Sequence, residues 1–199
     1  MQNKEMFLLP LWQQLNQLSP VSNELQEFLL AGFSIQHFKK GTLLLEEENI
    51  CTHLWFLIDG LLRSYHTIGE NEMTSRIMFT NHVVISPGSF FTQTPAIESI
   101  ETLSDCTVAT LSYTYLQSVY KNFPEFNYHT RIITEQYFYK QEQRLYMLRK
   151  PDAKSKYEYF FKNYSEYLNE IPQKYIASFL GIARETFNRV RNDRGKLKQ

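Results

Sequence analysis

Hydrophobic positions divide the first 111 residues into a helical segment followed by a series of strands. Over residues 11–31 they recur at helical spacing, with a break at Ser19-Pro20 and a stop at Gly32. Over residues 33–38 polar and apolar residues alternate, as they do in half-buried strands, and residues 53–58 are rich in β-forming and aromatic side chains. The predicted strands cover residues 33–38, 42–45, 53–58, 61–67, 72–79, 83–85, 100–103 and 107–111. Short strands at turn spacing, one of them ending at Asp59-Gly60, are typical of a small antiparallel sandwich or barrel.

The helical period returns after Leu111, and it predicts one short helix over residues 115–122 and then a long one. Pro124 suits the first turn of this long helix, and no breaker follows until Pro151. At 1.5 Å per residue the helix is roughly 39 Å long. Its apolar residues form stripes that together surround it: Ile132, Tyr139 and Tyr146; Ile133, Tyr137 and Met147; Phe138, Leu145 and Leu148. We therefore expect the barrel to cover one side and a second copy of the chain the other, the alternative being a plain core helix.

Charge is unevenly distributed along a chain whose composition is otherwise that of an ordinary globular protein. The 199 residues carry 21 basic and 21 acidic side chains, yet residues 172–199 have a net charge of +5 and the rest −5. A basic end on an acidic body suggests a polyanionic partner for that end, whereas a solvated terminus is the simpler alternative. Cys51 and Cys106 are too few for a disulfide framework or a cysteine-only metal centre, and we read both as core thiols.

Residues 172–192 predict two helices joined by a tight turn. Pro172 starts the first helix, and Gly181 can take the positive φ that the turn requires. The expected inward positions are Ile176, Ala177 and Leu180 in the first helix and Ala183, Phe187 and Val190 in the second. This is the layout of a helix-turn-helix, whose second helix enters the DNA major groove. The alternative is a pair of core helices with a polar face.

Arginine dominates the outer face of the second helix. We expect base contacts from Arg184, Glu185, Asn188 and Arg189. The arginine fork matches the two acceptors of guanine and glutamate accepts from cytosine, each good contact contributing about 1–3 kcal/mol of discrimination. We expect phosphate contacts, which give affinity and salt dependence, from Lys174, Thr186, Arg191 and Arg194, with Lys196 and Lys198 beyond them.

The order of these parts resembles the Crp/Fnr family of bacterial transcription regulators, the catabolite activator type. The resemblance covers residues 25–192 and is strongest over 54–65 and 171–191; Arg184-Glu185-Thr186 followed by Arg189 is similar to the family's recognition-helix motif. It implies an α+β fold with an antiparallel β-roll like a cyclic-nucleotide-binding jelly roll over 1–123, a dimerisation helix over 124–150 and a winged helix-turn-helix over 151–199. It also implies a homodimer that binds double-stranded DNA, with RNA polymerase as a further candidate partner. Ala183 departs from the family, where a capping Ser or Thr is frequent.

The candidate effector pocket departs further from that family. Its cyclic-nucleotide binders hold the phosphate with a Gly-Glu pair and then an Arg-Ser or Arg-Thr pair, whereas here Gly88 is followed by Ser89 and the second pair is missing near Ser99. Glu98 and Glu101 bring negative charge to the same place, and a buried phosphate needs cations or donors. We expect cAMP and cGMP to bind poorly, so the effector is an unknown small molecule or there is none.

Other classes of function find little support in the sequence. There is no stretch of 18 apolar residues and no signal-peptide pattern, so we expect a cytoplasmic protein. No two histidines stand two residues apart, as a cupin metal site requires, and hydrolase and phosphate-loop motifs are missing. We therefore expect no enzyme activity and no cofactor. The remaining alternative is a small-molecule-binding β-barrel whose helical tail binds protein instead of DNA.

Overall fold

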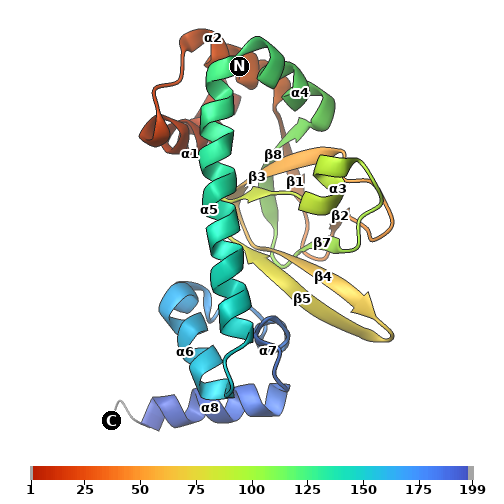
Figure 1. Ribbon diagram of the computed structural model, residues 1–199, viewed down its shortest axis with the longest axis vertical. Helices are drawn as coiled ribbons and strands as arrows, with labels where there is room; N and C mark the ends of the chain where they lie inside the picture. Colours follow the sequence, from red (N-terminus) through yellow and green to blue (C-terminus); the bar gives the residue numbers. More distant parts are fainter. Residues whose placement is uncertain (1, 197–199) are drawn as a thin grey trace.

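One long helix connects the two ends of the molecule, and a β-roll stands beside it (Figure 1). The structure, a computed structural model, describes the backbone of residues 2–196 and the side chains of residues 4–193. The helices are α1 Gln2–Leu18, α2 Asn23–Gly32, α3 Pro87–Thr92, α4 Tyr113–Asn122, α5 Pro124–Leu148, α6 Ala153–Tyr164, the 3-10 turn η1 Ser165–Tyr167, α7 Gln173–Leu180 and α8 Arg184–Lys196. The strands are β1 Ser34–Phe38, β2 Leu43–Leu45, β3 His53–Asp59, β4 Leu62–Ile68, β5 Asn71–Met78, β6 Val83–Val84, β7 Ser99–Thr102 and β8 Cys106–Ser112.

The strands form two four-stranded antiparallel sheets. One has the order β1-β8-β3-β6 and the other β2-β7-β4-β5. Each of the eight predicted strands is present, with its ends within one residue of the prediction. The short helix α3 was not predicted, because six residues are too few for a helical period to be recognised. The fold is therefore the expected mixed architecture, with an antiparallel β-roll followed by helices.

Alternation along the strands of the second sheet creates two hydrophobic cores instead of one. Leu62, Met78 and Ile100 belong to the core inside the β-roll, together with residues of α1, α2 and α4. Their neighbours Leu61 and Ile77 face outward and are buried all the same. Because successive side chains of a strand point to opposite faces, this sheet has apolar groups on both.

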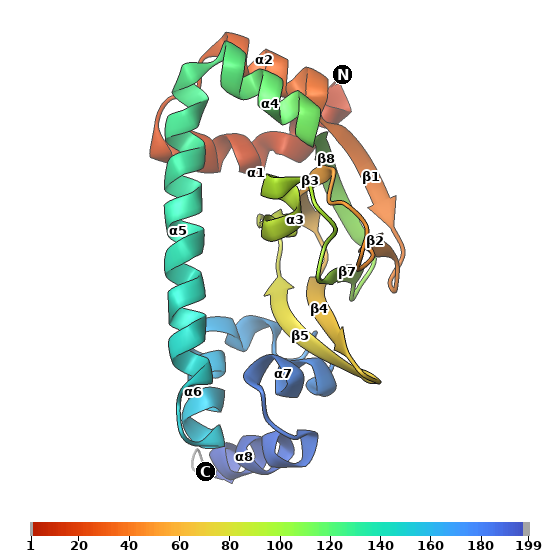
Figure 2. The ribbon, with the colours of Figure 1, turned by 45° about the vertical axis from the view of Figure 1, so that its right-hand side comes forward.

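The C-terminal helical unit, residues 153–196, covers this outer face. Phe79 follows strand β5 and stacks on Tyr164 and Tyr167, with ring centroids 5.5 and 3.9 Å apart. The shared core also contains Phe160 and Phe179 of the unit. The helical unit is thus packed against the β-roll as well as connected to α5 (Figure 2).

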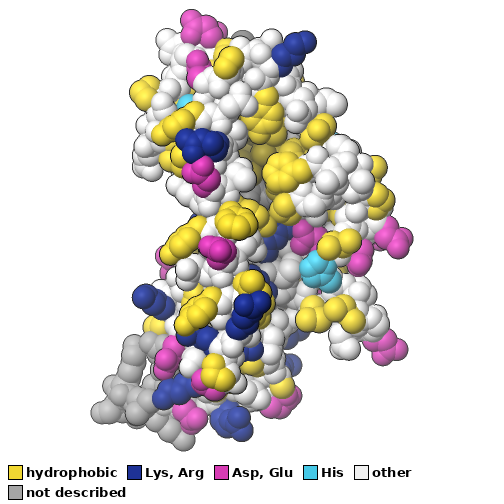
Figure 3. Space-filling model, in the orientation of Figure 1, with side chains coloured by type: hydrophobic (Ala, Val, Ile, Leu, Met, Phe, Trp, Pro, Cys, Tyr) yellow, Lys and Arg dark blue, Asp and Glu magenta, His cyan; other side chains and the backbone are white. Residues whose placement is uncertain are grey.

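Helix α5 runs the length of the molecule and packs mainly at its ends. It contacts α1 and α4 at its beginning and α6 at its end. Between these ends Phe138 and Tyr139 are 65% and 61% exposed, and Leu145 and Tyr146 are also exposed. Hydrophobic side chains lie on the visible face along the course of this helix (Figure 3). The expectation that the barrel covers one whole side of the helix is thus wrong for its middle, residues 134–140, where all side chains but that of Tyr137 are exposed.

The expected wing of the C-terminal unit is not found. Between α6 and α7 the chain forms only the turn η1, and residues 153–196 contain no strand. The connection of eight residues between Tyr164 and Gln173 is too short for a wing hairpin together with its turns. Among residues 2–196, no helix combines the length and apolar character that crossing a bilayer requires.

Candidate nucleic-acid interface and the β-roll interior

The C-terminal unit begins at a capped helix. Asp152 accepts a hydrogen bond from the amide of Ser155 at 2.7 Å, which satisfies one free N–H of the first turn of α6 and confirms the predicted N-cap. Tyr157 and Phe160 of this helix are buried. Helix α6 therefore supplies the base on which α7 and α8 pack.

The turn between α7 and α8 has the predicted geometry. Gly181 has φ +61° and ψ +43°, and its amide donates to the carbonyls of Ala177 and Ser178. Ile182 donates to the carbonyl of Ala177 at 3.1 Å, closing the turn. Four of the expected inward residues are buried: Ile176, Ala177, Leu180 and Phe187.

Two of the expected inward residues lie differently. Val190 is only half-buried against the same core. Ala183 is exposed, so placing it inward was wrong. It immediately precedes α8, and its carbonyl accepts the amide of Phe187, so it acts as the residue at which the helix starts.

The expected base-contact residues lie on the outer side of α8. Arg184, Glu185 and Arg189 are exposed, and Asn188 is half-buried. Among residues 4–193, neither Arg184 nor Arg189 forms an ion pair with another described side chain. Helix α8 lies at the end of the molecule away from the β-roll (Figure 1). The two guanidinium groups are therefore free to contact a ligand.

The expected phosphate-contact residues are more scattered. Lys174 is exposed on the first turn of α7, with its Nζ 4.6 Å from the ring centroid of Tyr175. Thr186 is half-buried. Arg191 lines a depression of about 290 Å³ beside residues 168–173. The side chain of Arg194 lies outside the described residues, as do those of Lys196 and Lys198.

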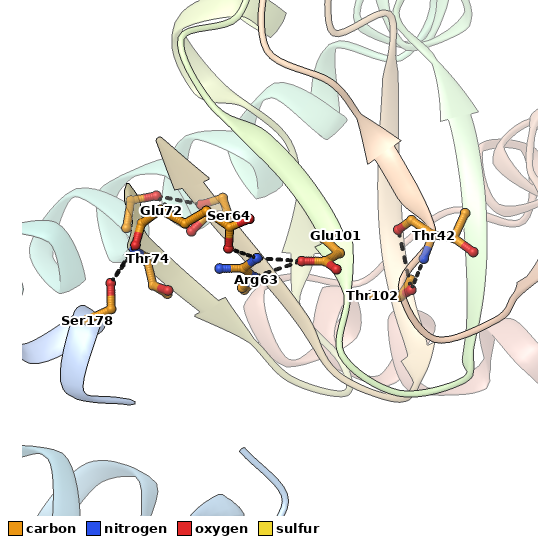
Figure 4. A network of polar contacts seen from close by, with 9 residues as sticks. Thr42, Arg63, Ser64, Glu72, Thr74, Glu101, Thr102 and Ser178 are labelled. Atoms are coloured by element: carbon orange, nitrogen blue, oxygen red, sulfur yellow. Dashed lines mark hydrogen bonds and ion pairs between the residues drawn. The ribbon is translucent and has the colours of Figure 1, made fainter. Parts of the chain in front are cut away.

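The free edge of the second sheet is occupied by α7. Strand β5 ends that sheet, so the backbone groups on its outer side have no partner strand. The Oγ of Ser178 accepts from the amide of Thr74 at 2.8 Å and donates to the carbonyl of Glu72 at 3.2 Å (Figure 4). Arg144 of α5 donates to the carbonyls of Thr74 and Phe179. Burial lowers the pKa of Arg144 to about 10, so it still carries its charge at neutral pH.

Arg63 joins the same region from the outer face of β4. Its guanidinium donates to Glu101 at 2.7 and 2.9 Å and to Glu72 at 2.5 Å. It lies between two rings, 4.0 Å from the centroid of Tyr65 and 3.9 Å from that of Tyr175 on α7. Burial by itself lowers the pKa of Arg63, but the hydrogen bonds to the two carboxylates outweigh burial and raise it. The side chain is 2% exposed and fully ionised.

Two of the three candidate effector residues form hydrogen bonds to the backbone of the β-roll. Ser89 is buried, accepting from the amide of Cys51 at 2.8 Å and donating to the carbonyl of Thr94 at 2.5 Å. Ser99 is buried and accepts from the amide of Glu47. Gly88 is exposed on α3, and a Cβ at this position would have no atom within 4 Å. The structure thus engages both hydroxyls and places Gly88 outside, instead of gathering the three around an open pocket.

The two carboxylates expected to give this region a net negative charge are both neutralised. Arg76 of β5 lies 2.5 Å from Glu98, and Arg63 lies 2.7 Å from Glu101. The expectation of two uncompensated carboxylates was wrong because it considered only residues near them in sequence. Both arginines come from the β4–β5 hairpin, which lies beside β7 in the sheet. Glu98 and Arg76 lie on the inner face, and Glu101 and Arg63 on the outer one.

Arg63 and Arg144 were not among the candidate residues. Arg63 follows Leu61 and Leu62 within a predicted strand, which is an unusual place for a charge and thus a recognisable sign of a buried partner. Arg144 had no such sign, because it ends a run of charged and polar residues, 140–144, in a long helix. Its partners are 35 and 70 residues away in sequence.

Comparison with known proteins agrees with the fold. Residues 35–123 match the cyclic nucleotide-binding domain family. A search of curated protein sequences finds no match. Among solved structures, FixK2 from Bradyrhizobium japonicum is 14% identical, with TM-score 0.73 over 83% of this chain and 86% of that one. A putative Crp/Fnr-family transcriptional regulator from Eubacterium rectale is 21% identical, with TM-score 0.67 over 85% and 82%.

A third similar structure is the catabolite activator protein of Thermus thermophilus. It is 16% identical, with TM-score 0.56 over 93% of this chain and 88% of that one. The likeness extends over most of both chains, well beyond the β-roll. At these identities the likeness concerns the fold: a cyclic nucleotide-binding-like β-roll with helices arranged as in Crp/Fnr regulators.

Proposed function

We propose that this protein is a sequence-specific DNA-binding transcription regulator of the Crp/Fnr type and not an enzyme. The observation that carries the proposal is that Arg184 and Arg189 are exposed on α8, the second helix of the C-terminal pair, and form no ion pair with any side chain of residues 4–193. A helix presenting arginine forks to solvent fits the major groove, where guanine offers two acceptors side by side. Glu185, on the same exposed surface, adds an acceptor for cytosine.

The regulator acts as a homodimer in this proposal. The exposed apolar residues of α5 lie on one side of the helix, which a second copy would cover: Tyr128, Phe138, Tyr139, Leu145 and Tyr146. Pairing two α5 helices brings two C-terminal units to the same end. Two recognition helices about 34 Å apart can enter successive major grooves on one face of the duplex.

The decisive experiment isolates genomic DNA fragments bound by the purified protein and sequences them. We expect a shared, two-fold symmetric motif. The variant Arg184→Ala with Arg189→Ala should lose the motif while remaining folded and dimeric, because each lost base contact removes about 1–3 kcal/mol of discrimination. The matched control is Lys154→Ala with Lys162→Ala, which also removes two exposed positive charges but takes them from α6 and leaves the side chains of α8 unchanged.

The salt dependence of binding separates DNA from a protein partner. Phosphate contacts release counterions, so affinity for DNA should fall steeply between about 50 and 200 mM salt. Arg191→Ala should lower the slope of log affinity against log salt by about one. Retention of the same motif by the double arginine variant, or selection of no motif by the native protein, would refute the proposal.

A further inference from the structure

We propose that Arg63, Arg144 and Ser178 are positioning residues, which hold the helix-turn-helix at a fixed place on the β-roll and thereby set the separation of the two recognition helices. This inference rests on the proposed function, and it concerns which contacts decide where the DNA-reading helices stand. None of the three side chains lies on the reading face of α8. They act on α7, the helix that precedes it.

Helix α7 covers the open edge of the second sheet. Thr74 on the edge strand presents an N–H and a C=O outward, and both are bonded, the first to Ser178 and the second to Arg144. Leaving such groups unpaired in a buried position costs about 1–3 kcal/mol each. A helix that shifted along the strand would leave these two groups buried without partners. The edge of the sheet therefore favours one position of α7 along β5.

Arg63 adds a directional contact between the β-roll and α7. Its guanidinium is fixed by Glu101 and Glu72 and packs between two aromatic rings, only one of which, Tyr175, belongs to the C-terminal unit. A planar cation held by two carboxylates cannot follow a moving ring, so the stacking fixes α7 laterally. The Nη1 of Arg63 and the hydroxyl of Thr74 are buried without a partner among the described residues. The stacking of Arg63 on Tyr175 therefore persists although burying these two polar atoms without partners costs free energy.

The docking of α7 on the β-roll also involves the proposed dimer helix. Arg144 belongs to α5, the proposed dimer helix, and its guanidinium bonds to the β-roll and to α7 together. The dimer helix, the edge strand and the helix-turn-helix therefore meet at one side chain. Since α8 remains exposed in this arrangement, the docked state is the one that binds DNA. Loosening it would permit several separations of the recognition helices and lower the affinity for a site with one fixed spacing.

Tyr175→Ala tests the inference without changing a residue of the β-roll, because it removes the ring that α7 places on Arg63, a ring that the exposed Lys174 also contacts. The first readout is hydrogen exchange of the Thr74 amide, measured by NMR, since Tyr175 is not the residue that bonds this amide. We expect exchange to accelerate about five- to tenfold, in proportion to roughly 1 kcal/mol of lost stacking. The matched control, Tyr65→Ala, removes the other ring from the same guanidinium but lies within the β-roll, so it should leave Thr74 protected.

The second readout is the spacing preference on duplexes that carry two half-sites of the selected motif at varied separation. The native protein and Tyr65→Ala should prefer one spacing, and Tyr175→Ala should bind that spacing about fivefold more weakly while discriminating less between spacings. Unchanged Thr74 exchange and unchanged spacing preference in Tyr175→Ala would overturn the inference and leave the proposed function standing. If the native protein binds no DNA, the proposed function fails and the positioning role falls with it. Tighter DNA binding by Tyr175→Ala would also overturn the inference, because the docked state would then be inhibitory.

Discussion

Arg76 holds the carboxylate of Glu98 at 2.5 Å within the β-roll, and both side chains are almost completely buried. Ser64 accepts from the Nε of Arg76, and Ser75 donates to Glu98. The pair is thus neutral overall and well supplied with hydrogen bonds. A buried ion pair of this kind is hard to open from one side, because the remaining charge would be left without a partner.

We expect no binding of cAMP by the native protein. A cyclic phosphate entering this part of the β-roll would have to compete with Glu98 for the only arginine on the inner face of the β4–β5 hairpin among the described residues. Titration calorimetry should therefore show no binding at micromolar concentrations. In Glu98→Gln the arginine loses its carboxylate, and weak cAMP binding should appear. Micromolar affinity of the native protein would contradict the prediction.

We expect Phe138→Glu with Tyr139→Glu to convert the protein to monomers. The two side chains are among the most exposed apolar groups of α5, and two buried carboxylates per copy would oppose association. Sedimentation velocity measures the change. Gln136→Glu adds a charge at an exposed position on another side of the same helix and should leave the dimer intact. A native protein that is already monomeric would remove the basis of this prediction.

Gly60→Ala should destabilise the β-roll severely. Gly60 has φ +107°, and a Cβ there would lie 2.5 Å from the Sγ of Cys106 and 2.6 Å from the carbonyl of Asp105. We expect a loss of about 3 kcal/mol or more in the free energy of unfolding, from strain and overpacking together. Gly69→Ala is the comparison, since Gly69 also has positive φ but open space around it, and should cost only about 1–2 kcal/mol. Urea unfolding of the two variants should separate them, and equal losses would show that crowding at Gly60 is relieved.

Stability should decline in weakly acidic solution because of His82. Burial, with a smaller contribution from Lys140, lowers the pKa of His82 from 6.5 to about 4. The unfolded chain binds a proton below pH 6.5 while the folded protein does not, so this contribution to stability is fully present above pH 6.5 and is lost as the pH falls towards 4. The loss is on the order of 3 kcal/mol.

The control for this pH dependence is His82→Gln. Its side chain can still accept the amide hydrogen bond of Phe79 but does not titrate. Urea unfolding at pH 7 and pH 5 should show a smaller difference for this variant than for the native protein. An identical pH dependence of both proteins would exclude His82 as its source.

The sequence alone determined the local structure. Alternation over residues 33–38, stretches of β-forming and aromatic residues, and turns such as Asp59-Gly60 located the strands, and Asp152 and Gly181 marked a helix start and a turn through their local backbone preferences. The exposed arginines of α8 were also predictable, since charged groups without a partner remain in water.

The tertiary structure alone decided which charged and polar side chains become partners. Glu98 and Glu101 looked like an excess of negative charge until strand pairing placed Arg76 and Arg63 beside them, 22 and 38 residues away. Likewise, Arg144 and Ser178 meet the edge of β5 only because the sheet ends there. Periodicity reports which face of an element is buried, but the partner across that face depends on the order of strands and the packing of helices, which no local pattern contains.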